Sequence, residues 1–378
     1  MSNLKLHIVC FTIPYPVNYG GVFDLYYKLE PLKKLGIDIH LHCIQYGNNQ
    51  PQAILEKVCS QVSYYKRKKI FPIRFWGLPY IVESRIISQL INKLNQDDAP
   101  ILIEGIHGTG ILPHLKKKER KCIVRICNTE FIYYKNLVKT SRFSIKKLYY
   151  WSESIRLHKW ENALVRQGFQ FCSIAQLDLK IYQQQLRCKK ISYIPLFIPP
   201  WPFSSLIGKG KFCLYHGNLD VTENQEAIKW LIEEVYTVTQ YPLYIAGKSN
   251  GAFVNKMRTK NTNVRWIENP TELAMQQLIA DAHIHLLPSF NATGIKLKLL
   301  NALYNGRFCL VNEATIKDSG LEQLCTVANT KEAFREKIGE LYYKTFTQEA
   351  IDLRKSVLEK IYNNNKNAIL LKQELFGE

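Results

Sequence analysis

The sequence has no long apolar run. Its 378 residues contain no stretch of about 18 apolar residues, which is close to the minimum for a membrane-spanning helix. The opening segment, LKLHIVCFTI, is too short for a secretory signal and continues directly into PYPVNYGG. We therefore expect neither a transmembrane helix nor a cleaved leader, and we interpret this segment as a first β-strand.

Paired cysteine motifs are also missing. The ten cysteines are scattered singly, with no CxxC pair and no Cys/His cluster at zinc spacing. This distribution argues against a disulfide framework and against a metal site. We expect reduced thiols in a cytoplasmic protein.

Negative charge is scarce in one half of the chain. The formal net charge is +19. Residues 1–197 carry 30 Lys/Arg against 13 Asp/Glu, a net of +17, whereas residues 198–378 carry 21 against 19, a net of +2. A basic half attracts a polyanion such as nucleic acid, an anionic membrane face or a phosphorylated acceptor. No RNA- or DNA-binding motif accompanies the charge, so nucleic acid is the least favoured partner.

Both halves of the chain repeat one pattern, in which short apolar strands alternate with glycine loops and helices. The first half opens with a strand at residues 6–12, and the second restarts with a strand at residues 212–216. Apolar residues make up 46% of the chain, enough for a large core. The pattern predicts an α/β fold of two Rossmann-like, doubly wound domains that face a cleft.

We expect the domain boundary in the proline-dense segment ISYIPLFIPPWP. The amino-terminal domain would span residues 1–197, and the carboxy-terminal domain would span residues 198–347. A helical segment at about residues 348–378 follows, and its composition allows it to pack back on the first domain.

Polar side chains follow two expected strands of the first domain. Glu104 and His107 come where one strand ends, and Arg125, Asn128 and Glu130 come where the next one ends. Ligands usually bind at the carboxyl edge of a parallel sheet. We therefore expect these five side chains to line one crevice.

The stretch HIHLLPSFNATGIKLKLLNALYNGRFCLV predicts a strand, a loop, a helix and a second strand. The helix is expected to begin near Thr293 and Gly294 and to end at Gly306. Lys296 and Lys298 would then lie at a helix N-terminus, where positive charge is unfavourable unless an anion binds. We hypothesise that this loop holds the pyrophosphate of a sugar nucleotide, and the alternative is a solvated basic turn.

Residues 64–80, YYKRKKIFPIRFWGLPY, interleave basic and aromatic side chains. One interpretation is a surface that contacts anionic lipid headgroups and inserts aromatic rings at the interface. The alternative is a lysine-rich loop followed by core aromatics. The segment KKKERK at residues 116–121 has no aromatic residues and predicts only a solvated helix end.

Four segments, in their order along the chain, resemble those of GT-B-fold glycosyltransferases of the family 4 (group 1) type. They are PYPVNYGGVFDLYYKL, then EGIH with VRICNTEFIYYKNL, then LYHGNLDVTENQEAIKWL, and finally TGIKLKLLNALYNG. The second and third resemble segments of a bacterial subgroup that builds surface polysaccharides. The last resembles the nucleotide-binding loop and helix of the family.

The resemblance implies transfer of a hexose from a nucleoside-diphosphate sugar to a glycan or lipid-linked acceptor, in cell-surface polysaccharide or lipopolysaccharide synthesis. Such enzymes commonly retain the anomeric configuration. They use a nucleotide-sugar co-substrate without further cofactor or metal, and the sequence has no DxD-like Asp pair at a strand end. Location would be cytoplasmic and peripheral to the inner membrane face.

The resemblance also implies roles for named residues. The catalytic residues would be His107, Glu104 and Lys296, with Lys296 neutralising the diphosphate leaving group. The donor diphosphate and nucleotide would be bound by Gly20, Gly21, Gly217, Asn218, Lys248, Thr293, Gly294, Ile295, Lys296 and Asn301. The acceptor side would contain Arg125, Asn128 and Glu130.

Three positions depart from the family pattern. Asn301 stands where a ribose-binding glutamate is usual, Thr293 stands where the other glutamate is usual, and Cys127 replaces a histidine of the subgroup. An amide can hydrogen-bond a diol, but without charge assistance. Two alternatives therefore stand beside the transferase: a non-catalytic GT-B binding protein and a GT-B-fold UDP-N-acetylhexosamine epimerase.

Overall fold

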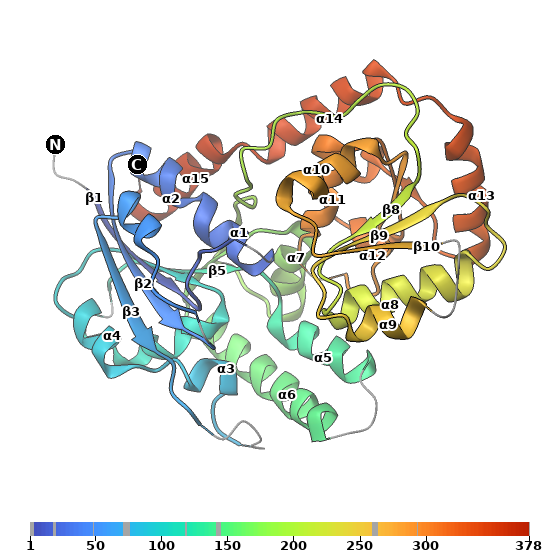
Figure 1. The fold of residues 1–378 in the computed structure, drawn as a ribbon. Coiled ribbons are helices and arrows are strands. Elements are labelled where there is room, and N and C mark those ends of the chain that lie inside the picture. The colour runs from blue at the N-terminus through green and yellow to red at the C-terminus, as the bar shows by residue number, and fades with distance from the viewer. Residues whose placement is uncertain are drawn as a thin grey trace. The chain divides into compact units, whose positions relative to one another are not determined.

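Two parallel β-sheets, one in each half of the chain, form the frame of the protein (Figure 1). The computed structural model describes residues 4–17, 20–47, 49–70, 76–117, 119–140, 145–258, 264–292 and 294–377. The first compact unit comprises residues 1–199, 293–295 and 362–378, and the second comprises residues 200–292 and 296–361.

The sheet of the first unit has seven parallel strands in the order β3-β2-β1-β4-β5-β6-β7. Their bounds are β1 Leu4–Cys10, β2 Ile37–Gln45, β3 Gln61–Lys66, β4 Ile101–Glu104, β5 Cys122–Ile126, β6 Gln170–Ser173 and β7 Ile191–Tyr193. In the central register Ile103 lies opposite Val9 on one side and Val124 on the other. The strand order reverses between β1 and β4, and ligands bind outside the carboxyl ends of strands at such a switch point.

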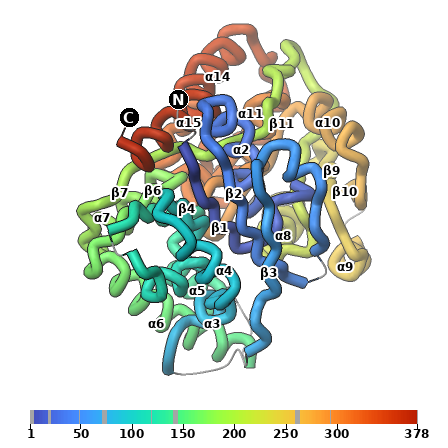
Figure 2. Tube along the Cα trace, turned by 90° about the vertical axis from the view of Figure 1, so that its left-hand side faces the viewer, coloured from blue at the N-terminus to red at the C-terminus, as the bar shows by residue number. Residues whose placement is uncertain are grey.

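Helices cover both faces of this sheet, because successive strand residues point to opposite sides. The helices are α1 Gly20–Tyr27, α2 Leu29–Lys34, η1 Ala53–Lys57, α3 Tyr80–Glu83, α4 Ser88–Leu94, η2 Ile106–His114, α5 Glu130–Thr140, α6 Ile145–Arg166, α7 Gln176–Gln185 and α15 Asn364–Phe376. On one face, Ile8 shares a core with Leu25 and Leu371. On the other, Val9 shares a core with Leu157. The last helix, α15, packs against α2 (Figure 2).

The second unit has a six-stranded parallel sheet in the order β10-β9-β8-β11-β12-β13. Its strands are β8 Cys213–His216, β9 Leu243–Gly247, β10 Val264–Glu268, β11 Ile284–Leu286, β12 Phe308–Val311 and β13 Thr326–Val327. Its helices are α8 Thr222–Trp230, η3 Leu231–Val235, α9 Ala252–Arg258, α10 Glu272–Asp281, α11 Leu297–Asn305, α12 Glu313–Ile316, η4 Glu322–Leu324, α13 Lys331–Tyr343 and α14 Gln348–Ile361.

Two helix predictions need correction. The helix after the cationic loop begins at Leu297, later than expected, since Lys296 occupies the N-cap position. The long carboxy-terminal helix is two helices, because Asn363 caps a new one by accepting a hydrogen bond from the Lys366 N–H. In the described part of the chain, no helix combines the length and apolarity needed to cross a membrane.

Candidate active site

Lys296 and the residues before it form an irregular loop that leads into α11. Gly294 has φ +69°, a backbone conformation that favours glycine, and Ile295 follows it. Thr293 lies outside the described residues. The first N–H groups of α11, which have no partner within the helix, therefore follow Lys296 directly.

Lys298 lies in the first turn of α11 and is held by neutral partners. Its Nζ donates to the Tyr215 hydroxyl at 2.7 Å and to Asn224 Oδ1 at 2.8 Å, and it lies 4.6 Å from the centre of the Tyr215 ring. Burial and the neighbouring Lys296 lower the pKa of Lys298 to about 7, while Glu223 opposes the shift. Both of these hydrogen-bond partners of Lys298 are uncharged, and Glu223 is a carboxylate that interacts with it electrostatically. A bound anion would add negative charge beside Lys298.

The ends of β8 and β9 approach each other closely beside this lysine. Gly217 has φ +152°, and a Cβ atom on Gly247 would lie 1.6 Å from the Gly217 carbonyl oxygen. The Asn218 carbonyl accepts a hydrogen bond from Asn224 Nδ2 at 2.8 Å, and the Lys248 carbonyl accepts one from Leu219 N at 2.8 Å.

Asn224 therefore connects the glycine loop after β8 to the start of α11, because it bonds both Asn218 and Lys298. The structure brings together Gly217, Asn218, Lys248 and Lys296, all predicted for the donor side. The sequence interpretation missed Tyr215 and Asn224. Their signal is weak: a tyrosine inside a strand, and an asparagine early in the helix after the loop.

Asn301 lies in the next turn of α11. Its Oδ1 accepts a hydrogen bond from Asn305 Nδ2 at 2.8 Å, and Asn305 Oδ1 in turn accepts one from Ser204 Oγ at 2.7 Å. A sugar diol at this position would find the Asn301 carbonyl oxygen already engaged, so its amide N–H groups are the better contact.

In the first unit, Glu104 and Arg125 belong to a buried cluster of four charges. Lys28 Nζ lies 2.5 Å from Glu104 Oε1 and 2.7 Å from Asp24 Oδ2. Arg125 donates to both oxygens of Asp24, at 2.6 and 2.8 Å. All four side chains are at most 2% exposed. Burial opposes ionisation of Asp24, but Arg125 and Lys28 hold its pKa well below the ordinary value.

This cluster revises the expected crevice, because Glu104 and Arg125 point into the core. Gly20 and Gly21 open helix α1, which carries Asp24, so the cluster fastens that helix to β4 and β5. We therefore propose a positioning role for Glu104 and Arg125. Cys127 places its sulfur within 4.8 Å of ligand atoms of Asp24 and Glu104, but the two cations already neutralise both carboxylates.

His107 lies in η2, shortly after β4, and keeps a polar atom without a partner. Its ring stacks on Phe11 at 4.7 Å between centroids. Nδ1 is buried and has no hydrogen-bond partner among the described residues. Burial, then Arg85 and Arg67, lower the pKa of His107 well below its ordinary value. The imidazole is therefore neutral and can exchange hydrogen bonds with a sugar hydroxyl.

Glu130 begins α5, just after β5, and the half-buried Asn128 precedes it. Burial, reinforced by Asp178 and opposed by Arg85, raises the pKa of Glu130 to about 8. Asp178 is itself engaged, accepting hydrogen bonds from the N–H and hydroxyl of Thr129 at 2.8 and 2.6 Å. Glu130 is thus protonated at neutral pH and can donate a hydrogen bond.

Comparison with known proteins adds to this geometry. Residues 210–344 match the family described as Glycosyl transferases group 1. Over 360 residues the chain is 26% identical to the "Uncharacterized 44.6 kDa protein in cps region" of Klebsiella pneumoniae, covering 88% of this chain and 90% of that protein.

Solved glycosyltransferase structures have a similar fold. Sucrose-phosphate synthase from Thermosynechococcus elongatus is similar with a TM-score of 0.70 at 10% identity, over 98% of this chain and 97% of that one. A glycosyltransferase from Rickettsia africae ESF-5 gives 0.64 at 13% identity over the full length of both chains. At such low identity these likenesses establish the fold, and they confirm the predicted GT-B class.

The family match covers the part of the chain that contains the glycine loop, Lys296 and Lys298. The expectation of a glycosyltransferase is confirmed by this match together with the fold. Residues 210–344 match the group 1 glycosyltransferase family, and the chain has the GT-B fold.

Proposed function

We propose that the protein transfers a hexose from a nucleoside-diphosphate sugar to a glycan or lipid-linked acceptor in cell-surface polysaccharide or lipopolysaccharide synthesis. The observation that carries this proposal is the cation pair at the start of α11. Lys298 is held by two neutral groups and has its pKa lowered to about 7, with Lys296 beside it. A diphosphate would relieve the repulsion between these two ammonium groups.

Lys296 and the free N–H groups of α11 would stabilise the negative charge that develops on the leaving diphosphate. Such preorganised groups contribute most where charge forms in the transition state. The glycines that end β8 and β9 allow a ligand to approach the backbone. Two lysines and a helix N-terminus supply positive charge without a metal, and we propose a metal-independent reaction with retention of configuration.

The acceptor would bind to the first unit, whose segment 1–197 has a net charge of +17. His107 and Glu130 follow neighbouring strands, β4 and β5, and both offer neutral hydrogen-bonding groups. The printed name of the Klebsiella pneumoniae relative refers to a cps region, which supports a surface polysaccharide as the product.

We also propose that the first unit associates with an anionic membrane surface. Trp76 is 78% exposed, and on α6 Ile145 is 73% and Trp151 50% exposed. The two segments adjoin, since the Tyr80 ring contacts the Tyr149 ring of α6 edge-to-face. Flotation with phosphatidylglycerol vesicles should fall as salt is added, and an absence of flotation at low salt would remove the membrane from the proposal.

Calorimetry with a panel of nucleoside diphosphates and their sugars tests the donor site. The Lys296→Ala variant should bind the preferred nucleotide diphosphate at least about tenfold more weakly, because it loses a charge-assisted contact. Lys355→Ala, which removes an exposed lysine from α14, is the matched control and should bind like wild type. Equal affinity of wild type and Lys296→Ala would contradict the proposal.

The same panel separates the alternatives. A non-catalytic binding protein would bind a sugar nucleotide but would neither hydrolyse nor transfer it. A UDP-N-acetylhexosamine epimerase would convert the sugar nucleotide without any acceptor. Release of nucleoside diphosphate that depends on added acceptor is the outcome expected for the transferase.

A further inference from the structure

A pocket opens in the first unit, where β2 and β3 end. Its volume is about 700 Å³, and its lining includes Tyr46, Lys66, Arg67, Lys68, Lys69 and Tyr80. The pocket lies at the carboxyl edge of the sheet, the edge that also carries His107 and Glu130.

Arg67 is the most constrained side chain of this pocket. Its guanidinium carbon lies 5.0 Å from the centre of the Tyr46 ring and 4.6 Å from that of Tyr80. Its Nε donates to Ser84 Oγ at 2.8 Å. Its Nη2 is buried and has no hydrogen-bond partner among the described residues. The guanidinium is therefore fixed in place with one donor group unused.

The lining of this pocket is cationic. Four of its lining residues are cations, and none of the described lining residues is an aspartate or glutamate. A stacked guanidinium with an unused N–H group can donate to a phosphate oxygen, and the lysines add positive charge around it.

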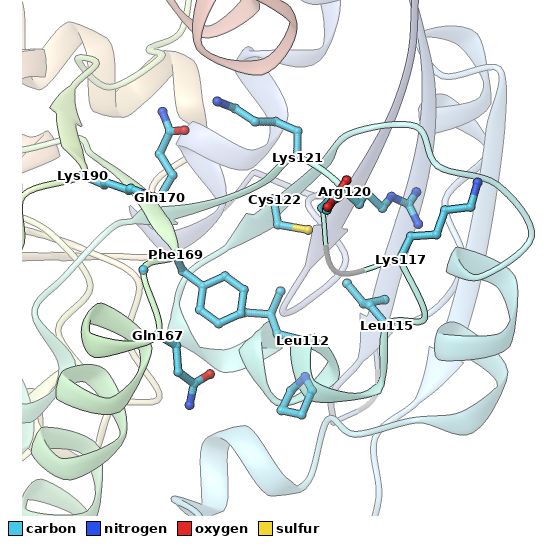
Figure 3. Close-up of a pocket in the computed structure, with 13 residues that line it drawn as sticks. Leu112, Leu115, Lys117, Arg120, Lys121, Cys122, Gln167, Phe169, Gln170 and Lys190 are labelled. Atoms are coloured by element: carbon cyan, nitrogen blue, oxygen red, sulfur yellow. The ribbon is translucent and has the colours of Figure 1, made fainter.

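Another basic pocket provides the contrast. It has a volume of about 680 Å³ and opens where β5 and β6 begin, next to Cys122 and Gln170 (Figure 3). Two of its cations have partners: Arg120 donates to Asp97 and to backbone carbonyls, and Lys117 pairs with Asp98 at 2.8 Å. The pocket at Arg67 differs because its guanidinium keeps an unpaired donor.

The Arg67 pocket is also electrostatically linked to the strand-end residues. Burial, then Arg85 and Arg67, lower the pKa of His107, and burial, then Arg67, lower that of Arg85. Arg85 is only 5% exposed and bonds the carbonyls of Ile81 and Phe11. Anionic charge bound beside Arg67 would therefore act on the groups near His107.

We propose that the pocket formed by Tyr46, Arg67 and Tyr80 with Lys66, Lys68 and Lys69 binds a phosphate group of the acceptor. This inference deepens the proposed function, since it names the acceptor as a phosphorylated compound. The phosphate can belong to a lipid phosphate or to a soluble sugar phosphate, and both would present the same oxygens to Arg67.

Binding assays on the full chain test this site in a Lys296→Ala background, so that the donor loop contributes little. The probes are phosphatidylcholine vesicles that contain dodecyl phosphate, the same vesicles with phosphatidylglycerol at equal charge, and glycerol phosphate in solution. Arg67→Gln and Arg67→Lys should each weaken binding of the phosphate monoesters about tenfold, because glutamine removes the charge and lysine lacks the planar guanidinium donor. Lys117→Gln, which changes a lysine already paired with Asp98, is the control and should leave binding unchanged.

Comparison of the three probes distinguishes a lipid phosphate from a soluble one. Binding of dodecyl phosphate vesicles that depends on Arg67 and exceeds binding of glycerol phosphate supports a lipid phosphate. Equal Arg67-dependent binding of glycerol phosphate supports a soluble acceptor. Equal binding of both vesicle types with no effect of Arg67→Lys, or no binding of any phosphate monoester, overturns the proposal.

Donor binding keeps the two proposals separate. In an otherwise wild-type chain, Arg67→Gln should keep its affinity for the nucleoside diphosphate, which also shows that the variant folds. The affinity of Lys296→Ala for the nucleoside diphosphate is a separate measurement, and it tests the donor site alone. A chain that binds phosphate monoesters through Arg67 but no nucleoside diphosphate would reject the donor proposal and keep this site.

Discussion

The carbonyl oxygen of Gly217 lies 1.6 Å from the position that a Cβ atom would take on Gly247. No side chain fits at Gly247 unless the ends of β8 and β9 separate. The loop after β8 also contains Asn218, whose carbonyl anchors Asn224 and thereby Lys298. The spacing of two strand ends therefore fixes where the cationic group lies.

Gly247→Ala should weaken nucleotide-diphosphate binding by about tenfold or more and should lower the free energy of unfolding, because its methyl group overlaps a backbone atom. Calorimetry and urea denaturation measure the two effects. Gly339→Ala is the matched control: Gly339 lies within α13 with only the Tyr241 hydroxyl at 3.8 Å. That change should stabilise the protein by about 0.5–1 kcal/mol. Wild-type behaviour of Gly247→Ala would show that the strand ends can separate freely.

Lys298 should couple diphosphate binding to proton uptake. Its pKa is about 7, so part of the population is neutral just above that pH, and a bound anion favours the charged form. Affinity should therefore fall as the pH rises through about 7 to 9. Calorimetry in buffers of different ionisation enthalpy should report uptake of protons in this range. Lys298→Arg should bind without that uptake, and an unchanged proton count would exclude Lys298 as its source.

The effect of Lys298 on stability has the opposite pH dependence. Between a folded pKa of about 7 and the ordinary value of 10.5, the unfolded chain binds the extra proton. The contribution of Lys298 to the free energy of unfolding therefore increases as the pH rises through this window. The difference in the free energy of unfolding between wild type and Lys298→Met, measured across this pH window, gives the contribution of Lys298.

Arg125→Met should destabilise the first unit by about 3–5 kcal/mol, because it leaves the buried Asp24 with one cation instead of two. The double variant Asp24→Leu/Arg125→Met should lose less, since it removes the charge that needs compensation. Urea denaturation measures both. The depressed pKa of Asp24 means that its contribution is present above the unfolded value of 3.8 and is lost as the pH falls below it. A double variant less stable than Arg125→Met would contradict this account.

Glu130 should make the protein less stable at alkaline pH. Its pKa is raised from 4.5 to about 8, so the folded chain holds a proton that the unfolded chain releases. Its contribution to the free energy of unfolding therefore decreases as the pH rises from 4.5 through 8. Glu130→Gln should remove this decrease, which is at least about 1.4 kcal/mol, the equivalent of one pKa unit. Glu340→Gln, at an exposed position of α13, should behave as wild type.

Local sequence patterns predicted those strands and helix ends that are determined by neighbouring residues. The continuous apolar runs of β4 and β5 are found at the expected residues, Ile101–Glu104 and Cys122–Ile126. Thr271 caps α10 by accepting a hydrogen bond from the Ala274 N–H, a pattern that depends only on neighbouring residues. By contrast β13 has only two residues, Thr326–Val327, too few to produce a periodic signal.

Contacts between distant residues explain what the sequence did not reveal. Gly306 follows the last residue of α11, but its φ of −109° is not the left-handed conformation that a helix-ending glycine usually supplies. A Cβ atom there would lie 2.0 Å from His285 Nε2, so packing against β11 requires the glycine. The burial of Glu104 and Arg125 likewise depends on Asp24 and Lys28, about a hundred positions away from Arg125 and 76 from Glu104.

The helix Asn364–Phe376 is synthesised after the second unit, yet it completes the core built by the first strands. Leu371 and Leu375 share a buried cluster with Leu6, Ile8 and residues of α2. During synthesis the apolar face of α2 therefore stays uncovered while the whole second unit is made. Synthesis order and folding order differ for this protein, and a nascent chain that lacks these residues should bind holdase chaperones through that face.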